Sequence, residues 1–367
     1  MAREMVLHVV MSSTNFPTTP LMKIKFLFAI IATFCAAQSI SMAQSATTDP
    51  VGFTTLTVTA KPVSLRGFTY VSLNMTRSAT YQGIVSSAAT VSGSTVLTFP
   101  ANSFTSNQFN GTANAHYVEI LNSGSYTGLI FDIVATTTNT ITLADDITSV
   151  ITGGSSTVKI RPHWTFATAF GANNSAGFQG SNTPTNADII QLYTPSTGLS
   201  ANYYYNTNNS RWQIGGSNAN DVVIPPDVAL IVERKQSSDI NFTLIGSVKL
   251  GTSGLLIEGG TATTYNMIPN PYPIPTVTLA TSGLYTGNNN TGVVGSNTPT
   301  NADILSIYTP STGVTTNYYY NTTNSRWQVG GSDASTVTIS AGSAVQIVRK
   351  SGRPSFIWFM PQPSMQL

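Results

Sequence analysis

The chain has 367 residues, of which 41% are hydrophobic and 8% are charged, and its formal net charge at neutral pH is +2. This composition argues against intrinsic disorder, because disordered chains combine high net charge with few apolar residues. Thr, Ser, Asn and Gly dominate the polar part, which is more typical of extracellular β-proteins than of cytosolic enzymes.

The first 43 residues are interpreted as a leader. Lys23 and Lys25 precede an apolar run at residues 26–37 and a small-x-small cleavage site at residues 41–43. This is the pattern of a secretory signal peptide, whose apolar run is too short to span a bilayer. We expect cleavage after Ala43 and a protein that is secreted or held at the cell surface or in the periplasm. Met1 and Met22 both stay open as the translation start.

Removal of the leader leaves 13 basic and 13 acidic residues, so the mature chain is formally neutral. It lacks the excess positive charge with which proteins bind nucleic acid, and no such partner is expected. The one cysteine, Cys35, lies in the leader, so hydrophobic cores rather than disulfides have to hold the exported chain. No later segment reads as a transmembrane helix, and the mature protein is not expected to span a membrane.

The N-terminal half of the mature chain reads as short β-strands. Alternating β-branched and aromatic residues predict strands at 53–59 and 68–73, within an N-terminal β segment at 44–79. Further strands, separated by Asn, Gly and Ser, are predicted for residues 80–160 at 96–99, 117–121, 129–134, 140–143 and 158–162. This region has no partner in the second half, so it is either a separate small β-domain or an insertion in the first module.

A repeat dominates the rest of the chain. The 38 residues from Gly180 recur from Gly295 at a constant offset of 115, and 30 of the 38 positions are identical. Several differences exchange apolar residues of similar volume, such as Ile214 for Val329, which a packed interior tolerates. A period of 115 is too long for a solenoid and fits tandem domains.

Each copy has its own predicted strands. In the first copy they are 188–193, 201–205, 211–214 and 228–233, and a parallel series runs from Asp303 to Arg349. The link at 206–210 is predicted to be a hairpin turn, because Asn tolerates the left-handed backbone region. We assign the first repeat module to residues 161–240, the second to 241–352 and a C-terminal tail to 353–367. The predicted fold is all-β, with two related β-sandwich-like modules and a small inserted or intervening β-domain.

The candidate ligand-binding site is an aromatic cluster in each copy. Strand alternation places Tyr203 and Tyr205 on one face and Tyr204 on the other, with Arg211 and Trp212 opposite them across the hairpin. Such rings could stack on sugars, and two linked sites would gain avidity. The favoured alternative is that most of these rings fill the core, because aromatic residues bury large areas. The candidates are Tyr203, Tyr204, Tyr205, Arg211, Trp212, Tyr318, Tyr319, Tyr320, Arg326 and Trp327.

Catalytic chemistry finds little support in the sequence. His116 and His163 have no recognisable partner for a nucleophilic triad, and no catalytic residue is assigned. Glu119 and Asp132 lie in predicted strands, where a pair of carboxylates could in principle support glycoside hydrolysis.

Two other acidic positions recur with the repeat. Asp188 and Asp303 are expected to bond backbone amides at the start of a strand. The oxygen-rich stretches 217–221 and 332–333 suggest a calcium site, but the second has a single carboxylate. The sequence contains no zinc spacing, phosphate loop or dinucleotide fingerprint, and no metal or cofactor is expected.

Several motifs resemble one family. The stretches 48–53, 81–83, 117–120 and 159–165, together with Asn-Pro-Tyr-Pro at 270–273 and its downstream Tyr and Trp, are similar to an uncharacterised family of exported β-rich proteins from verrucomicrobia and relatives. The likeness covers essentially the whole mature chain and implies export and a β fold. The family has no known activity, so the resemblance assigns no functional residue, and the tail from Arg353 departs from it.

The sequence therefore favours an exported, non-enzymatic structural or adhesive β-protein of the cell envelope or extracellular matrix. Two alternatives stay open, a carbohydrate-binding protein that uses the repeated Tyr and Trp clusters and a secreted glycoside hydrolase. Polysaccharide or other envelope components are the expected partners, and the sequence does not fix the oligomeric state.

Overall fold

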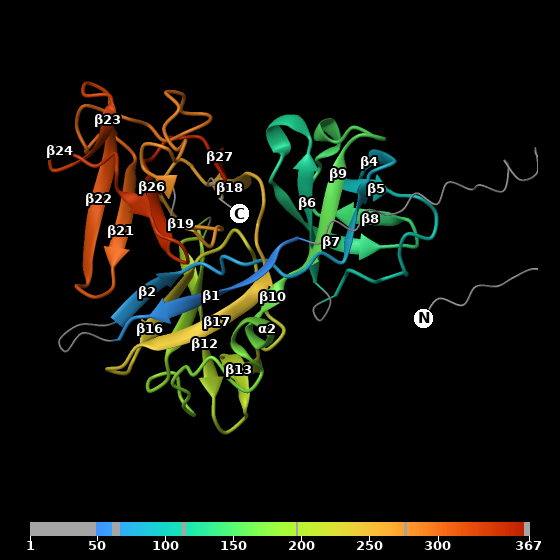
Figure 1. Cartoon of the computed structure of the whole chain (residues 1–367), viewed down its shortest axis with the longest axis horizontal. Coiled ribbons are helices and arrows are strands. Elements are labelled where there is room, and N and C mark those ends of the chain that lie inside the picture. Colours follow the sequence, from blue (N-terminus) through green and yellow to red (C-terminus); the bar gives the residue numbers. More distant parts are fainter. Residues whose placement is uncertain (1–48, 61–66, 112–114, 196, 275–276, 363–367) are drawn as a thin grey trace, which may run out of the picture. The chain divides into compact units, whose positions relative to one another are not determined.

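Antiparallel strands make up nearly all of the regular secondary structure in the described chain (Figure 1). The computed structural model describes residues 49–60, 67–111, 115–195, 197–274 and 277–362, and the predicted leader and cleavage site lie outside these ranges. Within them, the helical segments are α2 (Phe166–Phe170) and two 3-10 turns, η2 (Gly124–Tyr126) and η3 (Thr148–Val150). The prediction of an all-β fold with sandwich-like modules is confirmed.

The first module packs a two-stranded ribbon on a six-stranded sheet. The ribbon pairs β1 (Val51–Val58) with β17 (Ile240–Ser247). The sheet has the order β14-β13-β12-β11-β16-β2, and a short pair joins β10 and β15. The bounds are β2 (Gly67–Val71), β10 (Trp164–Thr165), β11 (Ile189–Thr194), β12 (Leu199–Asn206), β13 (Arg211–Ile214), β14 (Ser217–Asn218), β15 (Val223–Ile224) and β16 (Leu230–Arg234).

The second module repeats this architecture strand for strand. Its ribbon pairs β18 (Ser253–Ile257) with β27 (Phe356–Met360), and its sheet has the order β19-β26-β21-β22-β23-β24 beside a β20–β25 pair. The remaining bounds are β19 (Thr264–Pro269), β20 (Val277–Thr278), β21 (Ile304–Thr309), β22 (Val314–Asn321), β23 (Arg326–Val329), β24 (Ser332–Asp333), β25 (Thr338–Ile339) and β26 (Ala344–Arg349).

The region without a repeat partner is an insertion in the first module. Its seven-stranded sheet, here called the inserted sheet, has the order β3-β9-β6-β7-β8-β5-β4 and lies in the chain between β2 and β10. In the second module a short stretch, residues 270–276, joins the equivalent strands β19 and β20. The bounds are β3 (Tyr81–Ile84), β4 (Ser87–Val91), β5 (Ser94–Thr98), β6 (His116–Asn122), β7 (Ile130–Thr136), β8 (Thr140–Leu143) and β9 (Thr157–Pro162).

Strand pairing crosses the domain boundaries that we expected from the sequence. The N-terminal segment belongs to the first module, because β1 pairs with β17, which itself begins at the expected boundary. The tail belongs to the second module, because β27 pairs with β18 and buries Trp358. Both pairings join segments more than 90 residues apart, so local periodicity carries no information about them.

The predicted hairpin between β12 and β13 is present, but its turn chemistry differs from the expectation. The residue with left-handed backbone is Ser210 (φ 48°), and Ser325 (φ 50°) takes the same position in the second copy. Asn206 instead closes the turn through its side chain, whose oxygen accepts a hydrogen bond from the Asn209 amide at 2.9 Å. A side chain that bonds the backbone ahead of it is a common alternative way for Asn to favour turns.

The two modules share a small interface within one compact unit. Ala229, Met267 and Ala344 form a buried cluster, against which Tyr70 and Tyr193 pack. The ring of Tyr70 on β2 lies 5.2 Å from the ring of Tyr308 on β21, measured between centroids. Each module therefore contributes apolar side chains and rings to a common contact.

Candidate functional site

Most of the repeated aromatic positions are buried and so are not exposed as a platform for sugar binding, while Tyr320, Arg326 and Trp327 line a small cavity of about 200 Å³ in the second copy. The predicted alternation is correct, because Tyr203 and Tyr205 pack with Trp212 in the first module's core while Tyr204 packs elsewhere. Rings enclosed in this way fill the interior, where their large apolar area stabilises the fold most. The positions exposed by 9% or less are Tyr203, Tyr204, Tyr205, Trp212, Tyr318, Tyr319 and Trp327.

The other three candidate residues are half-buried and serve local structure. Arg211 and Arg326 each donate a hydrogen bond to the carbonyl of the second glycine in the following turn. Tyr320 stacks on Tyr285, with centroids 3.6 Å apart and ring planes inclined by 12°. Tyr320 also packs edge-on against Trp327, as Tyr205 does against Trp212 in the first copy. The ten positions therefore do not present one binding surface in two copies.

The repeated aspartates accept hydrogen bonds from backbone amides at the start of a strand, as the sequence predicts. Asp188 and Asp303 directly precede β11 and β21, and each accepts hydrogen bonds from two backbone amides. Each also forms a buried ion pair, with Arg234 and Arg349 respectively. The Nη1 atom of Arg349 lies 2.8 Å from Oδ2 of Asp303. These contacts stabilise the fold of each module, which explains why both aspartates recur in the repeat.

The first strand carboxylate, Glu119, belongs to a buried ionic network that ties the inserted sheet to its surroundings. Arg161 and Lys249 both pair with Glu119, and Asp49 pairs with Arg161 and Lys159. Burial alone would raise the pKa of the Glu119 carboxyl, but Lys249 and Arg161 lower that pKa to about 2. Glu119 is thus held as a carboxylate, whereas the acid of a glycosidase needs a raised pKa.

The second strand carboxylate, Asp132, has a different environment. Its side chain is 65% exposed, and its Oδ1 atom lies 3.0 Å from Nε2 of the buried His163. The two carboxylates therefore have separate partners. Glu119 pairs with the buried Arg161 and Lys249, whereas the exposed Asp132 of β7 pairs with the buried His163.

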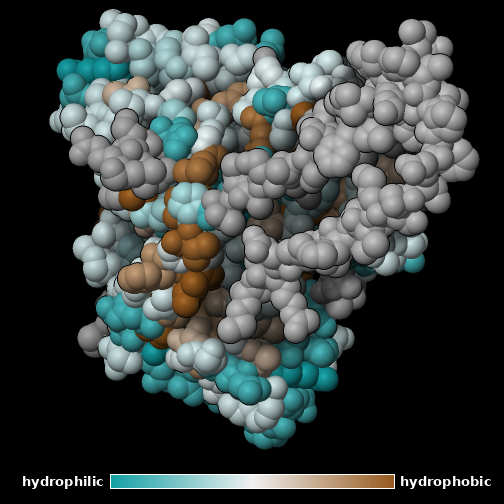
Figure 2. All heavy atoms as spheres, turned by 45° about the vertical axis from the view of Figure 1, so that its right-hand side comes forward, coloured by the Kyte–Doolittle hydropathy of each residue, from teal (hydrophilic) through white to brown (hydrophobic). Residues whose placement is uncertain are grey.

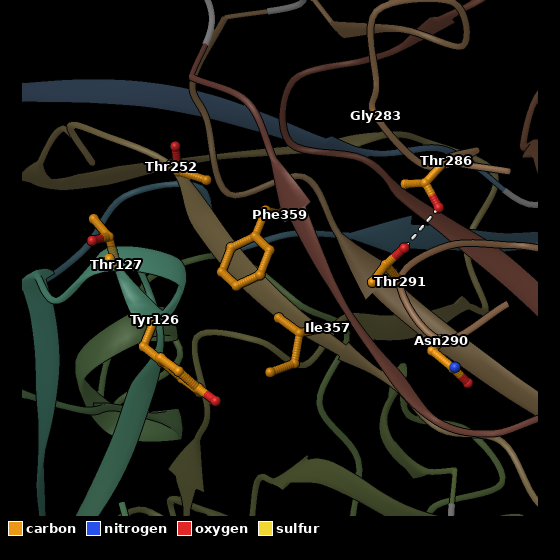
Figure 3. A pocket seen from close by; sticks show the side chains of 10 residues that line it. Tyr126, Thr127, Thr252, Gly283, Thr286, Asn290, Thr291, Ile357 and Phe359 are labelled. Carbon is orange, nitrogen blue, oxygen red and sulfur yellow. Dashed lines mark hydrogen bonds between the residues drawn. The ribbon is translucent and has the colours of Figure 1, made fainter. Parts of the chain in front are cut away.

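A cleft with a volume of about 630 Å³ lies between the inserted sheet and the second module. Figure 3 shows Phe359 and Ile357 of β27 at its centre, with Tyr126 and Thr127 on one side. The opposite side carries Thr286, Asn290 and Thr291, which lie on the loop between β20 and β21. Gly124, Thr252 and Gly283 complete the described lining, and all ten residues are uncharged.

The loop that carries the polar side of the cleft is hydrogen-bonded to the side chain of Arg349. Arg349 donates hydrogen bonds to the carbonyls of Asn289 and Gly292 while it pairs with Asp303. Across the loop, the hydroxyls of Thr286 and Thr291 are hydrogen-bonded at 2.8 Å (Figure 3). The polar groups are therefore presented by a supported loop, which favours a preformed site.

The opposite side is anchored to the second module by backbone contact. The amide of Gly254 in β18 donates to the carbonyl of Gly128 at 3.1 Å, just beyond η2. Gly128 has φ of +92°, and a Cβ there would overlap the carbonyl oxygen of Thr252, so both the conformation and the close approach require glycine. This contact fixes Tyr126 and Thr127 relative to β18.

Sequence reasoning missed the residues of this cleft, since they come from four separate stretches of chain. A signal was nevertheless present in the repeat. The strands before the loop, β10 and β20, start 113 residues apart, whereas the strands after it, β11 and β21, start 115 residues apart. The loop of the second copy is thus two residues longer than that of the first.

Exposed hydrophobic side chains are a further feature of the surface. Figure 2 shows hydrophobic residues gathered in a band on the face that it displays. Among the described residues, the ribbons carry exposed apolar side chains on their outward faces, including Val51, Phe53, Ile245 and Leu256. Phe53 and Ile245 are direct cross-strand partners. Patches of this kind are common at sites of interaction.

Comparison of the chain with protein-family models, with curated proteins and with solved structures gave no match. The part of the chain that the structure describes contains no helix with the length and hydrophobicity of a membrane span. Among the same residues, no group of three or more His, Cys, Asp or Glu side chains is arranged to hold a metal ion.

Proposed function

We propose that this chain is an exported, non-enzymatic β-protein of the cell envelope or extracellular matrix, and that it adheres by binding an uncharged ligand in the cleft beside β27. The observation that carries the proposal is the chemistry of that cleft. Its described lining combines two aromatic rings, an isoleucine, four threonines and an asparagine with glycines, without an acidic or basic side chain. Such a lining suits binding, whereas acid–base catalysis needs titratable groups within reach of the substrate.

The glycoside-hydrolase alternative is less well supported. Glu119 is buried in ion pairs with its pKa lowered to about 2, and Asp132 pairs with His163. Neither residue belongs to the described lining of the large cleft. A hydrolase needs one carboxyl group that stays protonated near neutral pH, beside a second that does not.

The test is to locate the mature protein and measure its adhesion. Native cells are fractionated, the protein is identified by mass spectrometry, and purified mature chain is incubated with isolated envelope and matrix material. We expect an N-terminus at Gln44, recovery outside the cytoplasm and saturable retention on the envelope material. An uncleaved cytoplasmic protein would contradict the proposal. So would polysaccharide turnover that Glu119→Gln or Asp132→Asn abolishes.

A further inference from the structure

The two modules provide an internal reference for what the fold alone requires. The inward residues of β17 and β27 can be matched by register, because Phe242 and Trp358 are each the third residue of the strand, are buried, and pair with a buried leucine, Leu56 or Leu255. The next residue toward the C-terminus points outward in each strand, and it is Thr243 in β17 but Phe359 in β27. The fold therefore accepts a polar residue at this outward position, and the phenylalanine of the second module needs another explanation.

The preceding outward position shows the same difference. Asn241 of β17 corresponds to Ile357 of β27, so a polar pair in one ribbon is an apolar pair in the other. Ile357 and Phe359 are the residues at the centre of the large cleft in Figure 3. The outward apolar side chains of β27 thus line the cleft.

The loop facing this apolar surface also differs between the modules. The loop between β20 and β21 is two residues longer than the loop between β10 and β11. It carries Thr286, Asn290 and Thr291, so the cleft has apolar side chains on one side and hydrogen-bonding side chains on the other. Both features line the same volume of about 630 Å³.

We propose that the cleft binds a neutral saccharide chain, a ligand class that rests on the adhesive function proposed above. A sugar ring has an apolar face of C–H groups, which can pack on Phe359 and Tyr126 as other apolar surfaces pack on aromatic rings. Its hydroxyl groups both donate and accept hydrogen bonds. The Thr286 and Thr291 hydroxyls are already hydrogen-bonded to each other, and Thr291 keeps a lone pair that can accept from a sugar hydroxyl. The Asn290 amide offers both a donor and an acceptor.

The saccharide is neutral because the described lining provides no cation for a uronate, sulfate or phosphate group. Burying an anionic group among neutral side chains would incur its desolvation penalty without an ion pair in return. The volume of the cleft falls in the range of pockets that enclose small ligands, which fits a few sugar units of a longer chain.

The experiment measures binding of the full mature chain to soluble polysaccharides by affinity electrophoresis and calorimetry. The probes are neutral glucans, mannans, galactans and xylans, with alginate and a sulfated galactan as acidic comparisons. The variant Phe359→Thr places the first-module residue in the second module, and the variant Asn290→Ser/Thr291→Ala shortens two exposed side chains of the loop. Tyr126→Ala is a further variant at an exposed position. Thr243→Ala, at the matching outward position of β17, is the control.

We expect binding to at least one neutral polysaccharide, weakened about tenfold or more by each cleft variant and unchanged by Thr243→Ala. Binding that survives all three cleft variants would overturn the inference. A preference for the acidic probes, or no binding to any neutral probe, would overturn it as well. Retention on envelope material without neutral-polysaccharide binding would refute the saccharide inference alone, whereas a cytoplasmic protein would refute the adhesive function.

Discussion

At the scale of single residues, the buried acidic side chains form ion pairs that hold strands in place. Asp188 and Asp303 pair with Arg234 and Arg349, and Glu119 pairs with Arg161 and Lys249. A buried ion pair is weak evidence for net stability, but removing one partner leaves an uncompensated charge and is strongly destabilising. In a chain with so few charges, the buried ones are therefore sensitive points for folding.

We predict a distinct acid dependence from Glu119. Its pKa is lowered from 4.5 to about 2. Because the folded-state value is the lower one, the ion pairs stabilise the protein fully above about pH 4.5, and this contribution is lost as pH falls toward the folded pKa. The difference corresponds to roughly 3 kcal/mol. Denaturant unfolding at several pH values measures it, with Glu119→Gln expected to lose about 3–5 kcal/mol near neutral pH.

The difference in unfolding free energy between wild type and Glu119→Gln should become smaller as the pH falls from about 4.5 to about 2. Asp132→Asn is the matched control, since the Asp132 side chain is 65% exposed and surface pairs contribute about 1 kcal/mol or less. If this difference in unfolding free energy stayed the same from neutral to strongly acidic solution, the Glu119 ion pairs would not be the source of the pH dependence.

At the scale of elements, the two faces of β27 have different surroundings. Phe356, Trp358 and Met360 point into the second core, while Ile357 and Phe359 point outward and line the cleft. Strand alternation thus places core residues and cleft residues one position apart. The first-module ribbon retains the inward half of this arrangement, with Ile240, Phe242 and Leu244 in its core.

This separation gives a prediction for two neighbouring residues of β27. Trp358→Ala should destabilise the protein by about 3–5 kcal/mol, because the side chain is 1% exposed and its indole N–H donates to the Ser282 carbonyl. Ile357→Asn, which introduces the first-module residue, should change stability by less than about 1 kcal/mol. Thermal and denaturant unfolding measure both, and similar losses for the two variants would contradict the assigned faces.

At the scale of the whole molecule, the sequence predicts what is local and repeated. Alternation in residues 202–206 gives the faces of the three tyrosines correctly, and Asp188 is correctly placed at a strand entry. The pairing of β1 with β17 is not predictable in this way, because some 180 residues separate the partners. The cleft is equally hidden, since Tyr126, Asn290 and Phe359 meet through tertiary contacts alone.

The contact between the modules provides the last prediction. Tyr70 and Tyr308 come from different modules, and their ring centroids lie 5.2 Å apart with planes inclined by 31°. Aromatic pairs of this kind contribute about 0.5–1.5 kcal/mol beyond their buried area. A double-mutant cycle with Tyr70→Ala and Tyr308→Ala should therefore give a coupling free energy in that range from denaturant unfolding.

The control cycle pairs Tyr70→Ala with Tyr285→Ala, whose ring stacks on Tyr320 within the second module. We expect no coupling there, because changes at sites without shared contacts add independently. Zero coupling between Tyr70 and Tyr308 would mean that this ring pair contributes nothing to the contact between the modules. Measured coupling would show that the two rings stabilise each other there, beside the hydrogen bonds that Ser72 of the first module makes to Gly342 and Asn270 of the second.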